Sequence, residues 1–270
     1  MAEKKVNRHA EIVLACSENH YYMGEKVLMD HALVRIVSGE VKVIQADRSY
    51  TFGYGDTFVF PKNQLSTMIK YPKDGLPYKS VVMNLTTSVL KTYYSEQKLD
   101  GLQPRSNGLI PLDRHPLLES FFASVIPYFD LESSLPEKIV LVKIEEAIEI
   151  LRAISPGIDE VLADFSQSGK IDLADFMEKN YMFNIPLEKF SSLTGRSLTT
   201  FKRDFKKTFR LSPQRWLIKK RLELAHYQLS EKRRRANDVY LETGFENLSH
   251  FSHAFKKHFG YPPTKLTQNN

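Results

Sequence analysis

The chain has 270 residues, which is room for about two domains of ordinary size. Hydrophobic residues make up 42% and charged residues 26%, a composition typical of a folded globular chain and not of a disordered one. No run approaches the ~18 consecutive apolar residues of a membrane-spanning helix, the first residues lack the apolar core of a signal peptide, and the single cysteine, Cys16, excludes an internal disulfide. We therefore expect a cytoplasmic protein that has no membrane partner and buries Cys16 as a small hydrophobe.

The N-terminal part has the composition of an antiparallel β-structure. Short runs rich in β-branched and aromatic residues, such as 33–37 and 57–60, follow one another from about residue 26 to residue 85. Glycines separate these runs at intervals suited to turns: Gly39, Gly53, Gly55 and Gly75. Many short strands with such turns predict a small β-barrel or sandwich, at about residues 20–90.

The period of the apolar residues changes further along, and we expect helices at about residues 115–165. Residues 137–154 contain no glycine or proline. Their apolar residues step by three and four to form one stripe: Leu141, Ile144, Ile148 and Leu151. A helix this apolar either packs in a core or pairs two subunits, so the stripe is also a candidate dimer interface. Residues 166–170 have the composition of a linker, which divides the chain into domains at 1–165 and 171–268.

Positive charge is concentrated in the last hundred residues. Residues 171–270 contain 19 Lys and Arg against 10 Asp and Glu, whereas residues 1–170 contain 19 against 22. This asymmetry points to a C-terminal module that faces a polyanion, with nucleic acid as the first candidate. An anionic membrane surface or simple solubility would account for the charge equally well, so a motif has to decide.

A repeat in the C-terminal part supplies that motif. Residues 197–213 and 247–263 align at an offset of fifty with seven identities in seventeen positions. The identical pairs are Leu198/Leu248, Phe201/Phe251, Phe205/Phe255, Lys206/Lys256, Lys207/Lys257, Phe209/Phe259 and Pro213/Pro263. A short helical run ending at glycine precedes each copy, over residues 187–195 and 239–244. This order of elements outlines two helix-turn-helix units, in which the second helix enters the major groove of DNA.

The second helix of each unit, predicted over residues 197–209 and 247–259, separates apolar from polar residues. The inner faces are apolar: Leu198, Phe201 and Phe205 in the first copy, and Leu248, Phe251 and Phe255 in the second. The outer faces carry no acid: Thr199, Lys202, Arg203 and Lys206 in the first copy, and Ser249, Ser252, His253 and Lys256 in the second. These groups suit base edges and phosphates, and the alternative is that both faces are merely solvated.

A longer helix is expected between the copies, from Pro213 to about Ser230, with Ser212 as its N-cap. A helix of this length spans about 27 Å. It could hold two reading helices near ~34 Å apart, which is one turn of B-DNA, so that one chain reads two successive major-groove segments. The basic run 232–235 follows, either as a solvated turn or as a phosphate contact.

These features resemble a known family. Residues 171–267 are similar to the C-terminal domain of AraC/XylS-type bacterial transcription regulators, in which a long helix joins two helix-turn-helix units. The matching residues are Val239, Gly244-Phe245, Phe251, Phe255-Lys256, Gly260 and Pro263, and in the central helix Ser212-Pro213, Trp216-Leu217, Arg221-Leu222 and Ala225. The resemblance implies base-reading positions at Thr199, Lys202, Arg203, Ser249, Ser252 and His253.

Phosphate contacts are expected from the helix N-termini and from neighbouring cations. The candidate residues are Ser197, Thr200, Lys206, Lys207, Asn247, His250, Lys256 and Lys257. Some positions depart from the family's pattern. Arg210 stands at a usual glycine, Ser191 and Tyr240 stand at a usual small alanine, and Thr267 stands where an arginine often closes the domain.

The N-terminal half is similar, less specifically, to the cupin-type sensory and dimerisation domain of many of these regulators. The paired histidines and glutamate of the metal-binding cupin signature are absent. His20, His31 and His115 are scattered, and we expect each to be a surface or hydrogen-bonded histidine. Common catalytic and nucleotide-binding motifs are also absent, so no metal, cofactor or enzymatic activity is expected.

The sequence thus predicts an α+β protein, with an N-terminal cupin-like β-barrel and helices and a C-terminal all-α domain of two helix-turn-helix units. Its expected function is sequence-specific DNA-binding transcription regulation. Double-stranded DNA is the expected partner, RNA polymerase and a second copy of the chain are further candidates, and the effector is left open. The alternatives are a non-specific architectural DNA-binding protein, against which two different reading faces argue, and a cupin-type enzyme with an attached DNA-binding domain, against which the missing metal ligands argue.

Overall fold

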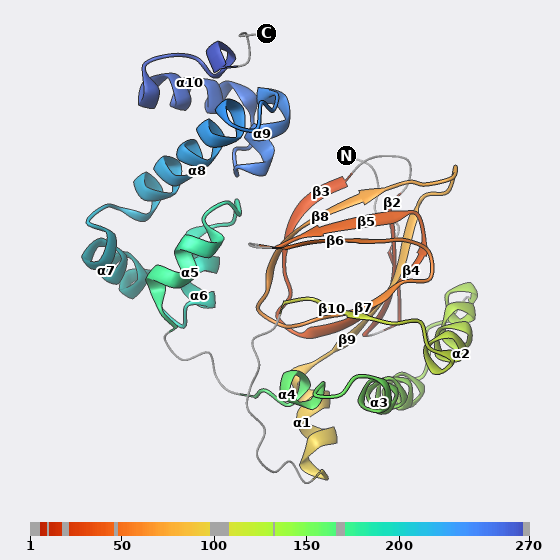
Figure 1. Cartoon of the computed structure of the whole chain (residues 1–270). Helices are drawn as coiled ribbons and strands as arrows, with labels where there is room; N and C mark the ends of the chain where they lie inside the picture. Colours follow the sequence, from red (N-terminus) through yellow and green to blue (C-terminus); the bar gives the residue numbers. More distant parts are fainter. Residues whose placement is uncertain are drawn as a thin grey trace. The chain divides into compact units, whose positions relative to one another are not determined.

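The chain folds as two units, the first Met1–Ser166 and the second Gln167–Asn270 (Figure 1). The structure, a computed structural model, describes residues 6–9, 11–17, 22–45, 48–97, 108–131, 133–165 and 171–266. The first unit combines strands and helices, and the described part of the second is helical, which gives the expected mixed α+β fold. The predicted linker, 166–170, lies outside the described residues.

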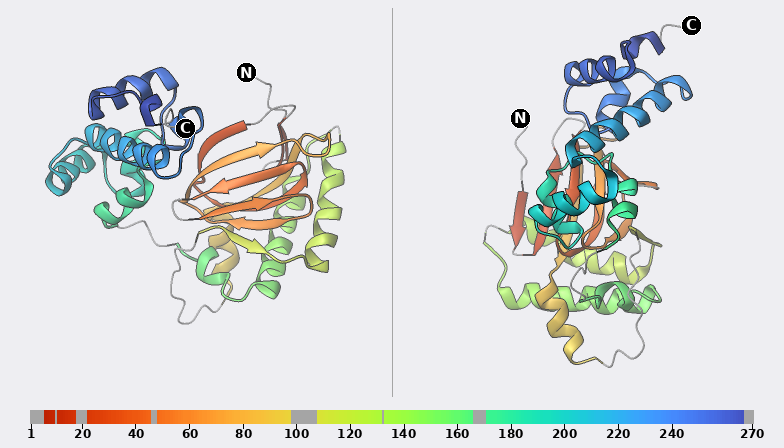
Figure 2. Two further views of the ribbon diagram at one scale, coloured as in Figure 1. Left: turned by 45° about the horizontal axis from the view of Figure 1, so that its top comes forward. Right: turned by 90° about the vertical axis from the view of Figure 1, so that its left-hand side faces the viewer.

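Two antiparallel sheets form the centre of the first unit (Figure 2). The strands are β1 (Val6–His9), β2 (Ile12–Ser17), β3 (Tyr22–Val27), β4 (His31–Ser38), β5 (Glu40–Ile44), β6 (Ser49–Phe52), β7 (Thr57–Phe60), β8 (Leu65–Tyr71), β9 (Tyr78–Leu85) and β10 (Ile110–Leu112). One sheet has the order β1-β2-β9-β4-β7-β10 and the other β3-β8-β5-β6. Within the described ranges no strand of one sheet pairs with a strand of the other, so the predicted β-barrel is wrong and the sheets form a sandwich.

Strand β4 has apolar residues on both of its faces because both faces are covered. Ala32, Val34 and Ile36 join the core between the two sheets, together with Val41 and Val43 of β5. Leu33, on the other face of β4, belongs to a second core that lies between the six-stranded sheet and the helices. This double burial explains why 33–37 is a nearly continuous apolar run and not an alternating one.

A glycine marks the turn where the chain leaves one sheet for the other. Gly39, between β4 and β5, has a φ of 72°. A Cβ at this position would lie 2.7 Å from both the carbonyl oxygen of Tyr71 and the Cα of Tyr78. The ends of β8 and β9 therefore approach this turn too closely for any residue with a side chain.

Helices cover one face of the six-stranded sheet (Figure 1). They are α1 (Thr87–Ser95), α2 (Pro116–Val125), the 3-10 turn η1 (Ile126–Asp130), α3 (Glu137–Ile154) and α4 (Asp159–Leu162). Helix α3 confirms the helix predicted over 137–154. The predicted dimer stripe on this helix needs correction, because Ile144, Ile148 and Leu151 are completely buried in the core of their own unit. Of that stripe only Leu141, 37% exposed, is accessible to another chain.

The second unit contains the helices α5 (Leu173–Asn180), α6 (Leu187–Leu193), α7 (Leu198–Phe209), α8 (Pro213–Ser230), α9 (Ala236–Glu242) and α10 (Leu248–Phe259), and the 3-10 turn η2 (Pro263–Leu266). Two pairs of helices, α6 with α7 and α9 with α10, are each joined by a short turn, and the long helix α8 connects them (Figure 1). Both predicted second helices and the predicted central helix are confirmed.

Cys16 is buried, as predicted. Among the described residues, none of the helices has both the length and the apolar character that crossing a membrane requires.

Candidate nucleic-acid interface

Helices α7 and α10 begin with the same kind of cap. The Ser197 hydroxyl accepts a hydrogen bond from the backbone N–H of Thr200 at 3.3 Å, and the Asn247 side chain accepts one from the N–H of His250 at 2.7 Å. Neither helix has an acidic residue in its first turn, and both have lysines in the last turn. Each N-terminus therefore presents its positive dipole end without a compensating carboxylate, which suits a phosphate group.

The two helices end in the same backbone conformation but with different residues. Arg210 has a φ of 58° and Gly260 a φ of 83°, both in the left-handed region. The Arg210 N–H donates to the carbonyl oxygen of Lys206, and the Gly260 N–H donates to that of Lys256. The arginine at the usual glycine position thus does not change where the helix ends, although it carries a steric cost that glycine avoids.

The inner faces pack on aromatic rings. Phe201, Phe205, Phe251 and Phe255 are completely buried, as predicted. Phe205 and Phe209 contact Trp216 of α8, at ring-centroid distances of 5.5 and 4.6 Å. The prediction for Leu248 is wrong, because as the first residue of α10 it lies beyond the covered part of the face and is 36% exposed.

The predicted contact residues lie on the solvent-exposed face of both helices. In α7 and its cap, Ser197, Thr199, Lys202, Arg203, Lys206 and Lys207 are exposed and Thr200 is half-buried. In α10 and its cap, Asn247, Ser249, His250, His253, Lys256 and Lys257 are exposed and Ser252 is half-buried. Each helix therefore presents hydroxyl and cationic groups on the face opposite its phenylalanines.

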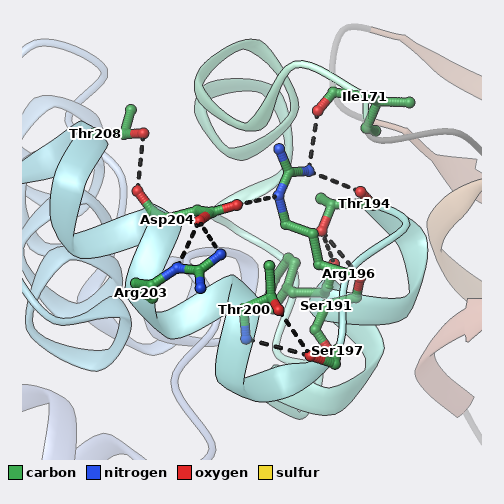
Figure 3. Close-up of polar contacts among 10 residues, drawn as sticks. Ile171, Ser191, Thr194, Arg196, Ser197, Thr200, Arg203, Asp204 and Thr208 are labelled. Atoms are coloured by element: carbon green, nitrogen blue, oxygen red, sulfur yellow. Dashed lines mark hydrogen bonds and ion pairs between the residues drawn. The ribbon is translucent and has the colours of Figure 1, made fainter.

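One acid of α7, Asp204, contacts Arg203 on the outer face, where no acid was expected. The Asp204 carboxylate lies between two guanidinium groups, 3.3 Å from Arg196 Nε and 3.3 Å from Arg203 Nε (Figure 3). Partial burial by itself would raise the pKa of Asp204, but hydrogen bonds from Arg196 and Arg203 outweigh it and hold the pKa below its ordinary value. Arg196 and Asp204 were missed because the sequence pattern gives no sign that a turn residue pairs with a helix residue eight positions later.

Helix α8 connects the two helix pairs. It has 18 residues, as expected, and Ser212 occupies its N-cap position, although the Ser212 side chain makes no capping hydrogen bond. The buried Arg221 donates to three backbone carbonyl oxygens, those of Tyr181 at 2.8 Å, Phe183 at 2.8 Å and Gly244 at 3.0 Å. One side chain thus ties the segment before α6 to the turn between α9 and α10.

The remaining departures from the expected pattern are accommodated by packing or ion pairing. Ser191 is buried and donates to the carbonyl oxygen of Glu188, and Tyr240 packs against the core of the second helix pair. In the basic run 232–235, Arg234 pairs with Glu242, and this hydrogen bond raises the pKa of Arg234. Thr267, which stands where the family often has an arginine, lies outside the described residues.

The first unit offers no alternative site of metal chemistry in its described part. Across the described ranges no group of three or more His, Cys, Asp or Glu residues is arranged to hold a metal ion. His31 is buried and accepts a hydrogen bond from the Lys62 N–H, and burial lowers the pKa of His31 to about 4. His115 caps α2 by accepting from the Leu117 N–H, and His20 lies outside the described residues.

Comparison with known proteins bears on both units. A family model described as a helix-turn-helix domain matches residues 190–269, which include both helix pairs except the first three residues of α6. A second model, described as the ExsA N-terminal regulatory domain, matches residues 31–152 of the first unit.

Similar proteins include the virulence regulon transcriptional activator VirF of Yersinia enterocolitica, 28% identical over 173 residues, which are 63% of each chain. The HTH-type transcriptional regulator ExsA of Pseudomonas aeruginosa is 33% identical over 136 residues, or 49% of each chain. The alignments thus span less than two thirds of the length of these relatives. Among solved structures, ToxT from Vibrio cholerae aligns over 96% of this chain and 97% of its own, with 11% identity and a TM-score of 0.43.

Residues 190–269 therefore match a helix-turn-helix domain, and residues 31–152 are similar to the ExsA N-terminal regulatory domain. In both units the chain is similar to AraC/XylS-type transcription regulators.

Proposed function

We propose that the chain is a sequence-specific DNA-binding transcription regulator that reads two successive major-groove segments, one with each helix pair. The observation that carries the proposal is the repeated geometry of α7 and α10. Both helices keep their phenylalanines inside and leave hydroxyl and cationic side chains exposed, on a unit with a large excess of basic residues. Each helix pair then acts as one helix-turn-helix unit.

The proposed contacts fall into two classes. Exposed lysines and the two capped N-termini bind phosphate oxygens and set the register on the duplex. The base-reading residues are Thr199, Lys202, Arg203, Ser249, Ser252 and His253. Arginine is suited to the paired acceptors of guanine, so Arg203 is the strongest single candidate among them.

The N-terminal unit is proposed to be a cupin-like sensory and dimerisation domain. Because Ile144, Ile148 and Leu151 are buried, the dimer proposal narrows to Leu141 and its exposed neighbours on α3, Ile139 and Val142, which are 41% and 52% exposed. The proposed setting is the cytoplasm, where binding of an effector or of RNA polymerase would alter transcription. In this proposal the chain catalyses no reaction.

Selection of random DNA duplexes by the full chain tests the proposal. The expected result is enrichment of two short motifs about one helical turn apart.

The Arg203→Ala variant should lose about 1–3 kcal/mol of binding free energy on the enriched site and should show a weaker preference at one base position. Lys206→Ala should weaken binding to all sequences and lower the salt slope by about one. A binder without sequence preference would instead show no enrichment above the salt-dependent background.

A further inference from the structure

A chain of polar contacts runs behind the proposed reading face of α7. Arg196, in the turn before the helix, has a side chain that is only 9% exposed. Its Nη1 donates to the carbonyl oxygens of Ile171 at 3.0 Å and Thr194 at 2.7 Å, and its Nε donates to Asp204 at 3.3 Å (Figure 3). The backbone thus fixes Arg196, and Arg196 in turn fixes the Asp204 carboxylate.

Asp204 holds one edge of the Arg203 guanidinium. Both Arg203 Nε and Arg203 Nη2 donate to Asp204 Oδ1 at 3.3 Å, whereas the Arg203 side chain as a whole is 74% exposed. A guanidinium has five N–H donors in one plane, so the side edge is occupied while the terminal Nη1–Nη2 edge is left for another partner. Two parallel donors on that edge match the O6 and N7 acceptors of guanine.

We infer that Asp204 is a positioning residue for base recognition, which orients Arg203 so that its terminal edge meets a guanine in the major groove. An arginine without such a partner would lose conformational freedom on binding, and it would donate to a phosphate as readily as to a base. An arginine held at its side edge has fewer orientations to lose and fewer alternative partners. The inference rests on the proposed DNA-reading function and adds to it the residue that sets specificity at one base position.

The second helix pair lacks this arrangement. Counting fifty residues on, Arg203 corresponds to His253 and Asp204 to Ala254, and the residue before the N-cap is Glu246 instead of Arg196. The inference therefore applies to one of the two reading helices. It places the sharper base preference in the half-site read by α7.

The test measures two quantities for each variant of the full chain: its affinity for the duplex obtained by selection, and the change in that affinity when a base pair is replaced. Each base pair is replaced in turn, and binding is measured for Asp204→Asn, Asp204→Glu, Arg203→Ala and the double variant D204N/R203A. The control is Asp175→Asn, which changes the charge by the same amount on α5, where Asp175 pairs with Lys179.

D204N is expected to lower discrimination at one base position by about tenfold, within the range for a bidentate arginine–guanine contact, and to leave the other positions within about twofold. D204E should retain most of the preference. R203A should lose the preference at that same position, and the double variant should behave like R203A, because the carboxylate acts only through the arginine.

Two outcomes would overturn the inference alone. In the first, D204N binds all duplexes more tightly by the same factor as D175N, so that the carboxylate only adjusts net charge. In the second, R203A loses the preference while D204N and D204E both keep it. Absence of any base preference in the unmodified chain would instead overturn the proposed function, and the inference with it.

The possibility that D204N unfolds the helix pair is covered by a second variant. Arg203→Lys leaves the Arg196–Asp204 pair untouched and preserves the charge, but a lysine has no second planar edge to present. The inference requires R203K to lose the same base preference at nearly unchanged affinity for other sequences. Retention of the preference by R203K would contradict it.

Discussion

Helices α7 and α10 share a core and differ at the surface. Each buries two phenylalanines on one face, starts at a side-chain cap and ends at a residue with positive φ. Outside that common frame, α7 has an arginine held by an aspartate, whereas α10 has the exposed His253 beside Ala254. The turn before the second helix also differs, with four residues between α6 and α7 and five between α9 and α10.

This difference shows which parts of a duplicated unit are constrained by folding. The residues that pack against α8 are identical or similar in the two copies, because a change in ring volume would leave a cavity. The residues that point to solvent have no such constraint, so they can differ between the copies, and in the proposed function they would read different bases.

Substitutions in the shared core should cause the largest losses of stability, and the losses should be similar in the two copies. Phe205→Ala and Phe255→Ala each remove a completely buried ring, so each should lower the free energy of unfolding by about 3–5 kcal/mol. Denaturant titration of the full chain, followed by circular dichroism, measures both. A loss several-fold greater for one copy than for the other would show that the two cores are not equivalent.

Substitution of the residue before each N-cap should affect the stability of the two copies differently. Arg196→Ala removes a nearly buried guanidinium with bonds to two carbonyls and a carboxylate, and should cost about 2–3 kcal/mol of unfolding free energy. Glu246→Ala changes an exposed residue bonded to Asn184, and should stay within about 0.5 kcal/mol. Equal effects in the same unfolding measurement would contradict the assigned role of Arg196.

The N-caps provide a finer comparison. The capping bond of Asn247 is 2.7 Å long and that of Ser197 is 3.3 Å, so Asn247→Ala should destabilise by about 1–2 kcal/mol and Ser197→Ala by about 0.5–1 kcal/mol. Thermal unfolding of the two variants measures the difference. The reverse order would indicate that bond length does not decide the strength of these caps.

Small effects of opposite sign are expected at the two helix ends. Arg210→Gly should stabilise the chain by about 0.5–1 kcal/mol, since glycine adopts positive φ without steric cost. Gly260→Ala should destabilise by a similar amount, because nothing lies within 4 Å of the added Cβ and only the conformational cost remains. A loss of stability in Arg210→Gly would mean that the arginine side chain makes a contact worth more than this cost.

Local features of the sequence were sufficient to predict most of the helices, although α1 and α5 were not predicted. The apolar period over 137–154 and the capped phenylalanine repeats specify α3, α7 and α10, because these signals depend on residues only three or four positions apart. Strands β1, β2 and β10 were not predicted, since their pairing with distant strands does not appear in a local pattern. For the same reason the strands were predicted to close into a barrel, whereas they form two separate sheets.

The candidate interface was predicted in part for the same reason. A helical wheel is enough to place Lys202 and His253 outside and Phe201 inside. It cannot show that Asp204 is shared between two arginines, because that depends on how the preceding turn folds back. Nor can it show which apolar stripe faces a sheet, so Ile144 and Ile148 were assigned to a dimer interface that they do not reach.

The three carbonyl bonds of Arg221 have a mechanical consequence. Because one buried side chain joins the segment before α6 to the turn before α10, its hydrogen bonds restrain the movement of one helix pair relative to the other. A protein that cannot adjust its own spacing transfers the adjustment to its partner. In the proposed function, a duplex whose two half-sites are separated by a base pair too many or too few must therefore twist or bend to fit, and the flexibility of the intervening base steps becomes part of what is recognised.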